Sequence, residues 1–92
     1  MLLRLFAVVA ALIAAGCAVS SQVVVQGAGP DDLLKLRKGP GLNYDIILGL
    51  PDGTRLTNHN CLTNNGKMWC RVSLANKPSV TGFVAADYLG RL

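Results

Sequence analysis

The sequence predicts a small all-β domain, a barrel or sandwich of about five to six short strands. Short apolar runs recur at regular spacing between clusters of Gly, Pro, Asn and Asp. No stretch after residue 17 has helical periodicity. The stretch CLTNNGKMWC, at residues 61–70, also has the pattern of a β-hairpin.

The expected strands follow one another along the chain. Residues 23–26 (VVVQ) are the first, ended by a loop rich in Gly, Pro and Asp. Residues 33–37 alternate leucines with basic residues, as a half-buried strand does, and residues 38–45 are irregular after Gly-Pro-Gly. Residues 46–50 (IILGL) end at a Pro-Asp-Gly turn. The remaining strands are expected at 54–61, 68–74 and 81–85, with turns at 75–79 and 86–89.

The hairpin turn falls at Asn65-Gly66, because Asn-Gly suits a type I′ turn, which needs positive φ at both central positions. Counting outward from the turn places Cys61 opposite Cys70. This is the closer kind of cross-strand pair, with Cα atoms about 4.5 Å apart, near enough for a disulfide. The alternative is two reduced cysteines buried as small apolar residues.

Residues 1–17 have the layout of a secretory signal. One positive charge, Arg4, precedes an apolar run over residues 5–15 that is too short for a transmembrane helix. Export provides the oxidising compartment that a disulfide requires.

The end of this segment has two interpretations. Ala-Ala-Gly before Cys17 resembles the lipobox of bacterial lipoproteins, in which the cysteine is lipidated and becomes the mature N-terminus. Lipidation would also use the odd cysteine. The alternative is ordinary cleavage after Ala18 or Ser20.

Composition and charge exclude several functions. The chain has nine Lys and Arg against five Asp, but no basic block, so nucleic acid is not an expected partner. One histidine and scattered aspartates are a poor set for a zinc or calcium site. Alternation places His59 on the face of Cys61, opposite Val72, where the disulfide leaves no free thiolate for a Cys-His pair. We therefore expect no catalytic residue, metal or cofactor.

Alternation along residues 68–74 separates a core face from an outer face. Cys70, Val72 and Leu74 form the more apolar face, so Trp69 points outward, opposite Leu62. Either Trp69 caps the barrel over Leu62, or it lines a ligand groove.

Three motifs together resemble a bacterial SH3 domain: LKLRKGPGLNYDIILGLPDGTRL, then a hairpin with WCRV, then TGFVAADYL. That family pairs an LNVRxGPGxxY opening with an LPxGT turn, a GWxxV strand and a GWVxxxYL ending. The resemblance covers residues 33–90 and implies an SH3-like barrel. Phe83 departs from the usual Trp, and the cysteine pair is not general to the family. The expected segments are a signal peptide (1–17), a tether with a short strand (18–32) and the SH3-like domain (33–92).

The resemblance also implies a binding groove, since aromatic residues line SH3-type surfaces. The candidate groove residues are Tyr44, Trp69, Tyr88, Arg37, Lys38 and Asn43. Arg37 and Lys38 either meet a ligand carboxylate or are solvated charges, and Asn43 suits a turn better than a ligand contact.

The implied function is non-catalytic binding of cell-wall peptide, either stem or cross-bridge, or of another envelope component. The protein would be a monomer in the periplasm or cell envelope, attached to the membrane only by lipid on Cys17. The alternatives are an envelope subunit that docks on a partner protein, and a secreted inhibitor or effector.

Overall fold

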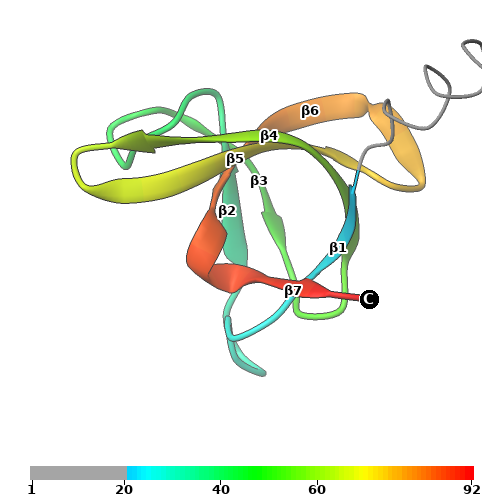
Figure 1. The fold of residues 1–92 in the computed structure, drawn as a ribbon. Helices are drawn as coiled ribbons and strands as arrows, with labels where there is room; N and C mark the ends of the chain where they lie inside the picture. The colour runs from blue at the N-terminus through cyan, green and yellow to red at the C-terminus, as the bar shows by residue number, and fades with distance from the viewer. Residues whose placement is uncertain (1–20) are drawn as a thin grey trace, which may run out of the picture.

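The computed structural model describes residues 21–92, which form one antiparallel sheet coiled into a half-barrel (Figure 1). The strand order in the sheet is β3-β2-β6-β5-β4-β1-β7. The elements are β1 (Ser21–Val25), β2 (Leu34–Arg37), β3 (Ile46–Leu50), β4 (Arg55–Asn64), β5 (Lys67–Leu74), β6 (Lys77–Ala85), the 3₁₀ helix η1 (Ala86–Tyr88) and β7 (Leu89–Arg91). The expected signal peptide and Cys17 lie outside the described residues. Within residues 21–92, no helix is long and apolar enough to cross a membrane.

The predicted all-β, SH3-like fold is confirmed, although several strand bounds differ: β1 spans residues 21–25 and not 23–26, and β4 continues to Asn64, three residues beyond the expected end. β6 begins at Lys77, four residues before the expected start at residue 81, because the preceding turn is shorter than its Asn and Pro content indicated. β7 was not expected. It has only three residues, and pairing with β1, which aligns Val25 with Leu89, defines it. So short a strand has no periodicity to detect in the sequence.

The core follows from the alternation of apolar side chains on the inner face. Leu34 and Leu36 of β2 are buried, as are Cys70 and Val72 of β5, on the faces that alternation predicted. Burying each large aliphatic side chain contributes about 1.5–3 kcal/mol. The remaining members of the core cluster are Val25, Leu50, Leu56 and Val84.

The hairpin of β4 and β5 has the predicted turn, register and disulfide. Asn65 and Gly66 have φ angles of 53° and 75°, as a type I′ turn requires. Cys61 pairs with Cys70, their Cα atoms are 4.0 Å apart, and a disulfide joins them. Of the two bridged residues, Cys70 is buried in the core and Cys61 is exposed.

The predicted position of His59 is wrong. The β4–β5 register shifts between Asn58 and Asn60, so that Asn58 faces Val72. His59 is the extra residue of this bulge, and its Nε2 lies 2.6 Å from Oγ of Ser73, a residue of the outer face of β5. A single inserted residue reverses the alternation from that point on, which the sequence pattern did not reveal.

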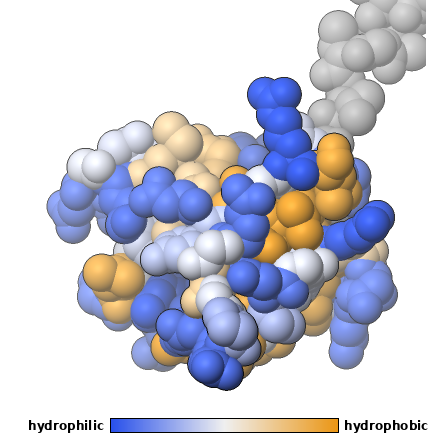
Figure 2. Space-filling view, turned by 90° about the horizontal axis from the view of Figure 1, so that it is seen from below, coloured by the Kyte–Doolittle hydropathy of each residue, from blue (hydrophilic) through white to orange (hydrophobic). Residues whose placement is uncertain are grey.

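Hydrophobic side chains also reach the surface of the domain. Figure 2 shows one face on which hydrophobic residues form patches between hydrophilic ones. Several exposed large hydrophobic residues matter below: Leu42 and Tyr44 in the β2–β3 loop (residues 38–45), Tyr88 in η1, and Leu33, Ile46, Ile47 and Leu48 at or near the edge strand β3.

Candidate ligand groove

Trp69 lines two depressions of the surface. The second lies where residues 38–45, the β2–β3 loop, approach the tip of the β4–β5 hairpin, and Figure 1 shows the backbone of these two segments side by side. The first depression has a volume of about 200 Å³, and its lining includes Arg37, Leu42, Trp69, Ala85 and Tyr88. The second has a volume of about 430 Å³ and is lined by Gly41, Leu42, Asn43, Asn64, Asn65, Lys67 and Trp69.

Trp69 lies on the predicted face of β5 but is not exposed. Its pairing partners across the sheet are Leu62 and Ala85, so its ring is on the side opposite Cys70. Only 3% of the residue is accessible to solvent, which corrects the expectation of a solvent-exposed ring. Alternation defines which face a side chain is on, whereas burial depends on what folds across that face. Here Leu42 and Tyr88 line the same depression as Trp69.

The two tyrosines have different places. Tyr88, from η1, is 37% exposed and lines the first depression with Trp69. Tyr44 is 42% exposed, but it packs on Gly39 of its own loop and lines neither depression. A Cβ atom at Gly39 would overlap the Tyr44 ring, so the glycine is required there for close approach. The structure therefore brings Trp69 and Tyr88 together and leaves Tyr44 apart from them.

Arg37 holds the β2–β3 loop in place. Its Nη1 donates to the carbonyl oxygens of Leu42 and Tyr44, at 3.1 and 3.0 Å. Because these bonds engage part of its guanidinium, Arg37 is a positioning residue for the loop and not simply a solvated charge. At the base of the loop, the Lys38 N–H donates to the Asp45 carbonyl at 2.9 Å, and the Lys38 side chain is exposed.

The hairpin tip is tied to the same loop. Nδ2 of Asn64 donates to the carbonyl of Pro40 at 2.7 Å. Asn43 is exposed and lines the second depression, together with Asn64 and Asn65 of the hairpin. Leu42 and Asn64 were not among the candidates from the sequence. No sequence motif identifies either residue, because they line the second depression only where the β2–β3 loop and the β4–β5 hairpin come together.

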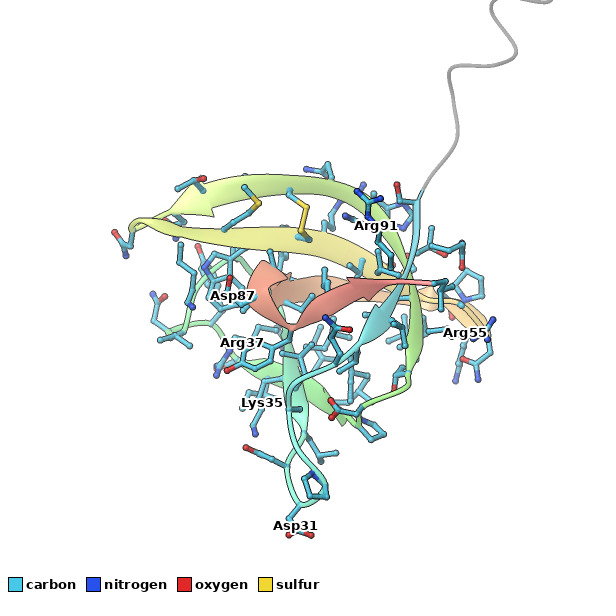
Figure 3. All side chains as sticks on the ribbon, turned by 60° about the horizontal axis from the view of Figure 1, so that its bottom comes forward. Asp31, Lys35, Arg37, Arg55, Asp87 and Arg91 are labelled. Atoms are coloured by element: carbon cyan, nitrogen blue, oxygen red, sulfur yellow. A yellow bond between two sulfur atoms is a disulfide. The ribbon has the colours of Figure 1, made fainter. Side chains whose placement is uncertain are left out.

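The charges near the groove are largely paired within the domain. Lys35 Nζ lies 3.1 Å from Asp32, and Lys67 Nζ lies 3.4 Å from Asp87. The backbone N–H of Leu33, followed by Lys35, lowers the pKa of Asp32 below its ordinary value. Figure 3 shows Lys35, Arg37 and Asp87 on one side of the domain and Arg55 and Arg91 on the other. Among residues 21–92, no three His, Cys, Asp or Glu side chains gather as a metal site would require.

Comparison with protein families matches residues 32–90 to the bacterial SH3 domain, which is not a catalytic domain. Comparisons with curated proteins and with solved structures found no match. The match covers more than half of the chain and includes β2 to η1, the elements that build the groove. The chain therefore belongs to the bacterial SH3 domain family.

Proposed function

We propose that the protein is an exported binding module that recognises cell-wall peptide or another envelope component through the two depressions beside Trp69. Bacterial SH3 domains are typically cell-wall binding modules. The observation that carries the proposal is an apolar rim held in a defined place. Leu42 and Tyr88 are exposed at the groove, and Arg37 fixes the backbone that presents Leu42. Concave sites with apolar walls and a few polar groups are the usual form of ligand sites.

The groove is tested by binding to purified peptidoglycan. Tyr88→Ala is expected to weaken binding about tenfold or more while the domain stays folded, because aromatic side chains contribute a large contact area and are enriched among the residues that carry most binding energy. The matched control is Met68→Ala, whose side chain is 52% exposed and lines neither depression. The signal is the fluorescence of Trp69, the only tryptophan, which lines both depressions. Unchanged affinity in the Tyr88 variant would contradict the groove.

A second candidate function, docking on a partner protein, is favoured by β3. This strand lies at one end of the sheet order, and its residues Ile46, Ile47 and Leu48 are exposed. An apolar edge strand without a charged residue is a surface on which another chain can add a strand. If Ile47→Asp abolishes capture of the protein by envelope extract, and Tyr88→Ala leaves that capture intact, this second function replaces the first.

The location outside the cytoplasm is indicated by the family and by the disulfide. We further propose that Cys17 is acylated and attaches the protein to a membrane, with ordinary cleavage after Ala18 or Ser20 as the alternative. The intact mass of the protein from membrane fractions is expected to correspond to a chain that begins at a lipid-modified Cys17. An unmodified N-terminus at Val19 or Ser21 would show ordinary secretion instead.

A further inference from the structure

The rim of the second depression is rich in side-chain amides. Asn43 comes from the β2–β3 loop, and Asn64 and Asn65 come from the tip of the β4–β5 hairpin. The volume of about 430 Å³ lies within the range of small-molecule sites, whereas that of the first depression is smaller, at about 200 Å³. The second depression is thus the larger of the two, and it is the one whose rim carries uncharged polar groups.

These amides are available to a ligand. No hydrogen bond joins the side chains of Asn43 or Asn65 to another residue in the described part of the chain. Asn64 uses Nδ2 to bond the Pro40 carbonyl, which leaves its Oδ1 free to accept. A side-chain amide both donates and accepts, and so does a hydroxyl or an acetamido group. A carboxylate only accepts hydrogen bonds and an ammonium group only donates them, so each would pair with the donors or the acceptors of these amides but not with both.

The charge of the second depression also favours an uncharged ligand. Among the described residues that line it, only Lys67 is charged, and its Nζ lies 3.4 Å from Oδ2 of Asp87. No carboxylate of residues 21–92 lines this depression, so a cationic ligand would find no counter-charge there, and an anionic ligand would compete with Asp87 for Lys67. The first depression differs, since Asp32, Lys35 and Arg37 all line it.

One apolar wall completes the second depression. Leu42 is 71% exposed, which is the largest exposure of any large hydrophobic residue described, and it lines both depressions beside the buried Trp69. The ring of a sugar has a face of C–H groups that can cover such a side chain, while its hydroxyl groups point outward to polar partners. Burial of that face against Leu42 would be favourable.

We propose that the second depression binds uncharged sugars with hydroxyl and acetamido groups, as in the glycan part of a cell wall, beside peptide in the first depression. This inference rests on the proposed function and adds a ligand class to one half of the groove. The side-chain amides of Asn43 and Asn65 form hydrogen bonds with the hydroxyl and acetamido groups of the sugar, and Oδ1 of Asn64 accepts another. Leu42 packs against the C–H face of the ring.

The probe for this subsite is the tetramer of N-acetylglucosamine, titrated into the mature chain. Asn43→Ala and Asn65→Gly are each expected to lower the affinity about 2- to 10-fold, the effect of one lost hydrogen bond. Glycine at position 65 removes the amide and still adopts the positive φ of 53° that the turn requires. The matched control is Asn76→Ala, an exposed asparagine of the β5–β6 turn away from the groove, which should leave the affinity unchanged.

Failure of the tetramer to bind, or an equal loss of affinity in the Asn76 variant, would overturn the inference. Purified peptidoglycan, titrated in parallel, distinguishes this failure from failure of the proposed function. If the wall polymer binds and the tetramer does not, the glycan subsite is wrong and the proposed function stands. If neither binds, recognition of the cell wall is wrong, and the glycan subsite with it.

Discussion

Trp69→Ala is expected to lower the free energy of unfolding by about 3–5 kcal/mol, the range for truncating a buried aromatic side chain. Trp69 is only 3% exposed, and the alanine would leave a cavity between Leu62 and Ala85, its neighbours across the sheet. Small domains are stable by about 5–15 kcal/mol in total. The variant should therefore be partly unfolded near room temperature or melt far below the unmodified protein.

The measurement is denaturant unfolding followed by circular dichroism, because the variant has no tryptophan to report by fluorescence. Met68→Ala is the matched control at the adjacent position. Its side chain is exposed, so its effect should stay within about 0.5 kcal/mol. A loss below about 1 kcal/mol in the Trp69 variant would show that the ring contributes little to the fold. Trp69 would then be primarily a ligand contact.

Removal of the Cys61–Cys70 disulfide is expected to cost about 2–3 kcal/mol, the loop-entropy estimate for a bridge that closes about ten residues. The double variant Cys61→Ala, Cys70→Ala gives this value in thermal or denaturant unfolding. Affinity at the second depression should also fall, since Asn64 and Asn65 lie at the tip of the hairpin that the bridge holds.

Single serine variants separate the bridge from burial. Both lose the bridge, but Cys70 is buried and Cys61 is exposed. Cys70→Ser places a hydroxyl in the core and should therefore be less stable than Cys61→Ser, by about 1–3 kcal/mol. Equal stability of the two variants would contradict the asymmetric burial, and a double variant as stable as the bridged protein would contradict a stabilising role for the disulfide.

The features predicted from the sequence are those that depend on a few consecutive residues. The hairpin register follows from Asn65-Gly66, because a two-residue turn aligns every later pair, including Cys61 with Cys70. The core face of β2 follows from the two-residue period of Leu34 and Leu36. The family motifs locate β2 to η1 in the chain, and residues 32–90 match that family.

The features that the sequence did not predict depend on contacts between distant segments or on one irregular residue. The bulge at His59 reverses the alternation of side chains along β4 after one position, and it is visible only in the backbone pairing of β4 with β5. The pairing of β7 with β1 joins the two ends of the domain. The place of Tyr44 on Gly39, apart from Trp69, depends on how residues 38–45 close through Arg37.

The sequence by itself determined that this chain forms a small all-β domain with a disulfide-bonded hairpin, and on which face of β5 Trp69 lies; the family motifs add that the domain is SH3-like. Turn chemistry and side-chain period are local properties, so they can be read without knowing the rest of the molecule. Only the tertiary structure decided that Trp69 is buried and that the groove divides into two depressions. Burial depends on which side chains fold across a face, and Leu42 and Tyr88 come to Trp69 from segments far away along the chain. The amide-rich rim of the second depression likewise depends on the tertiary structure, because Asn43 of the β2–β3 loop and Asn64 of the β4–β5 hairpin line it together.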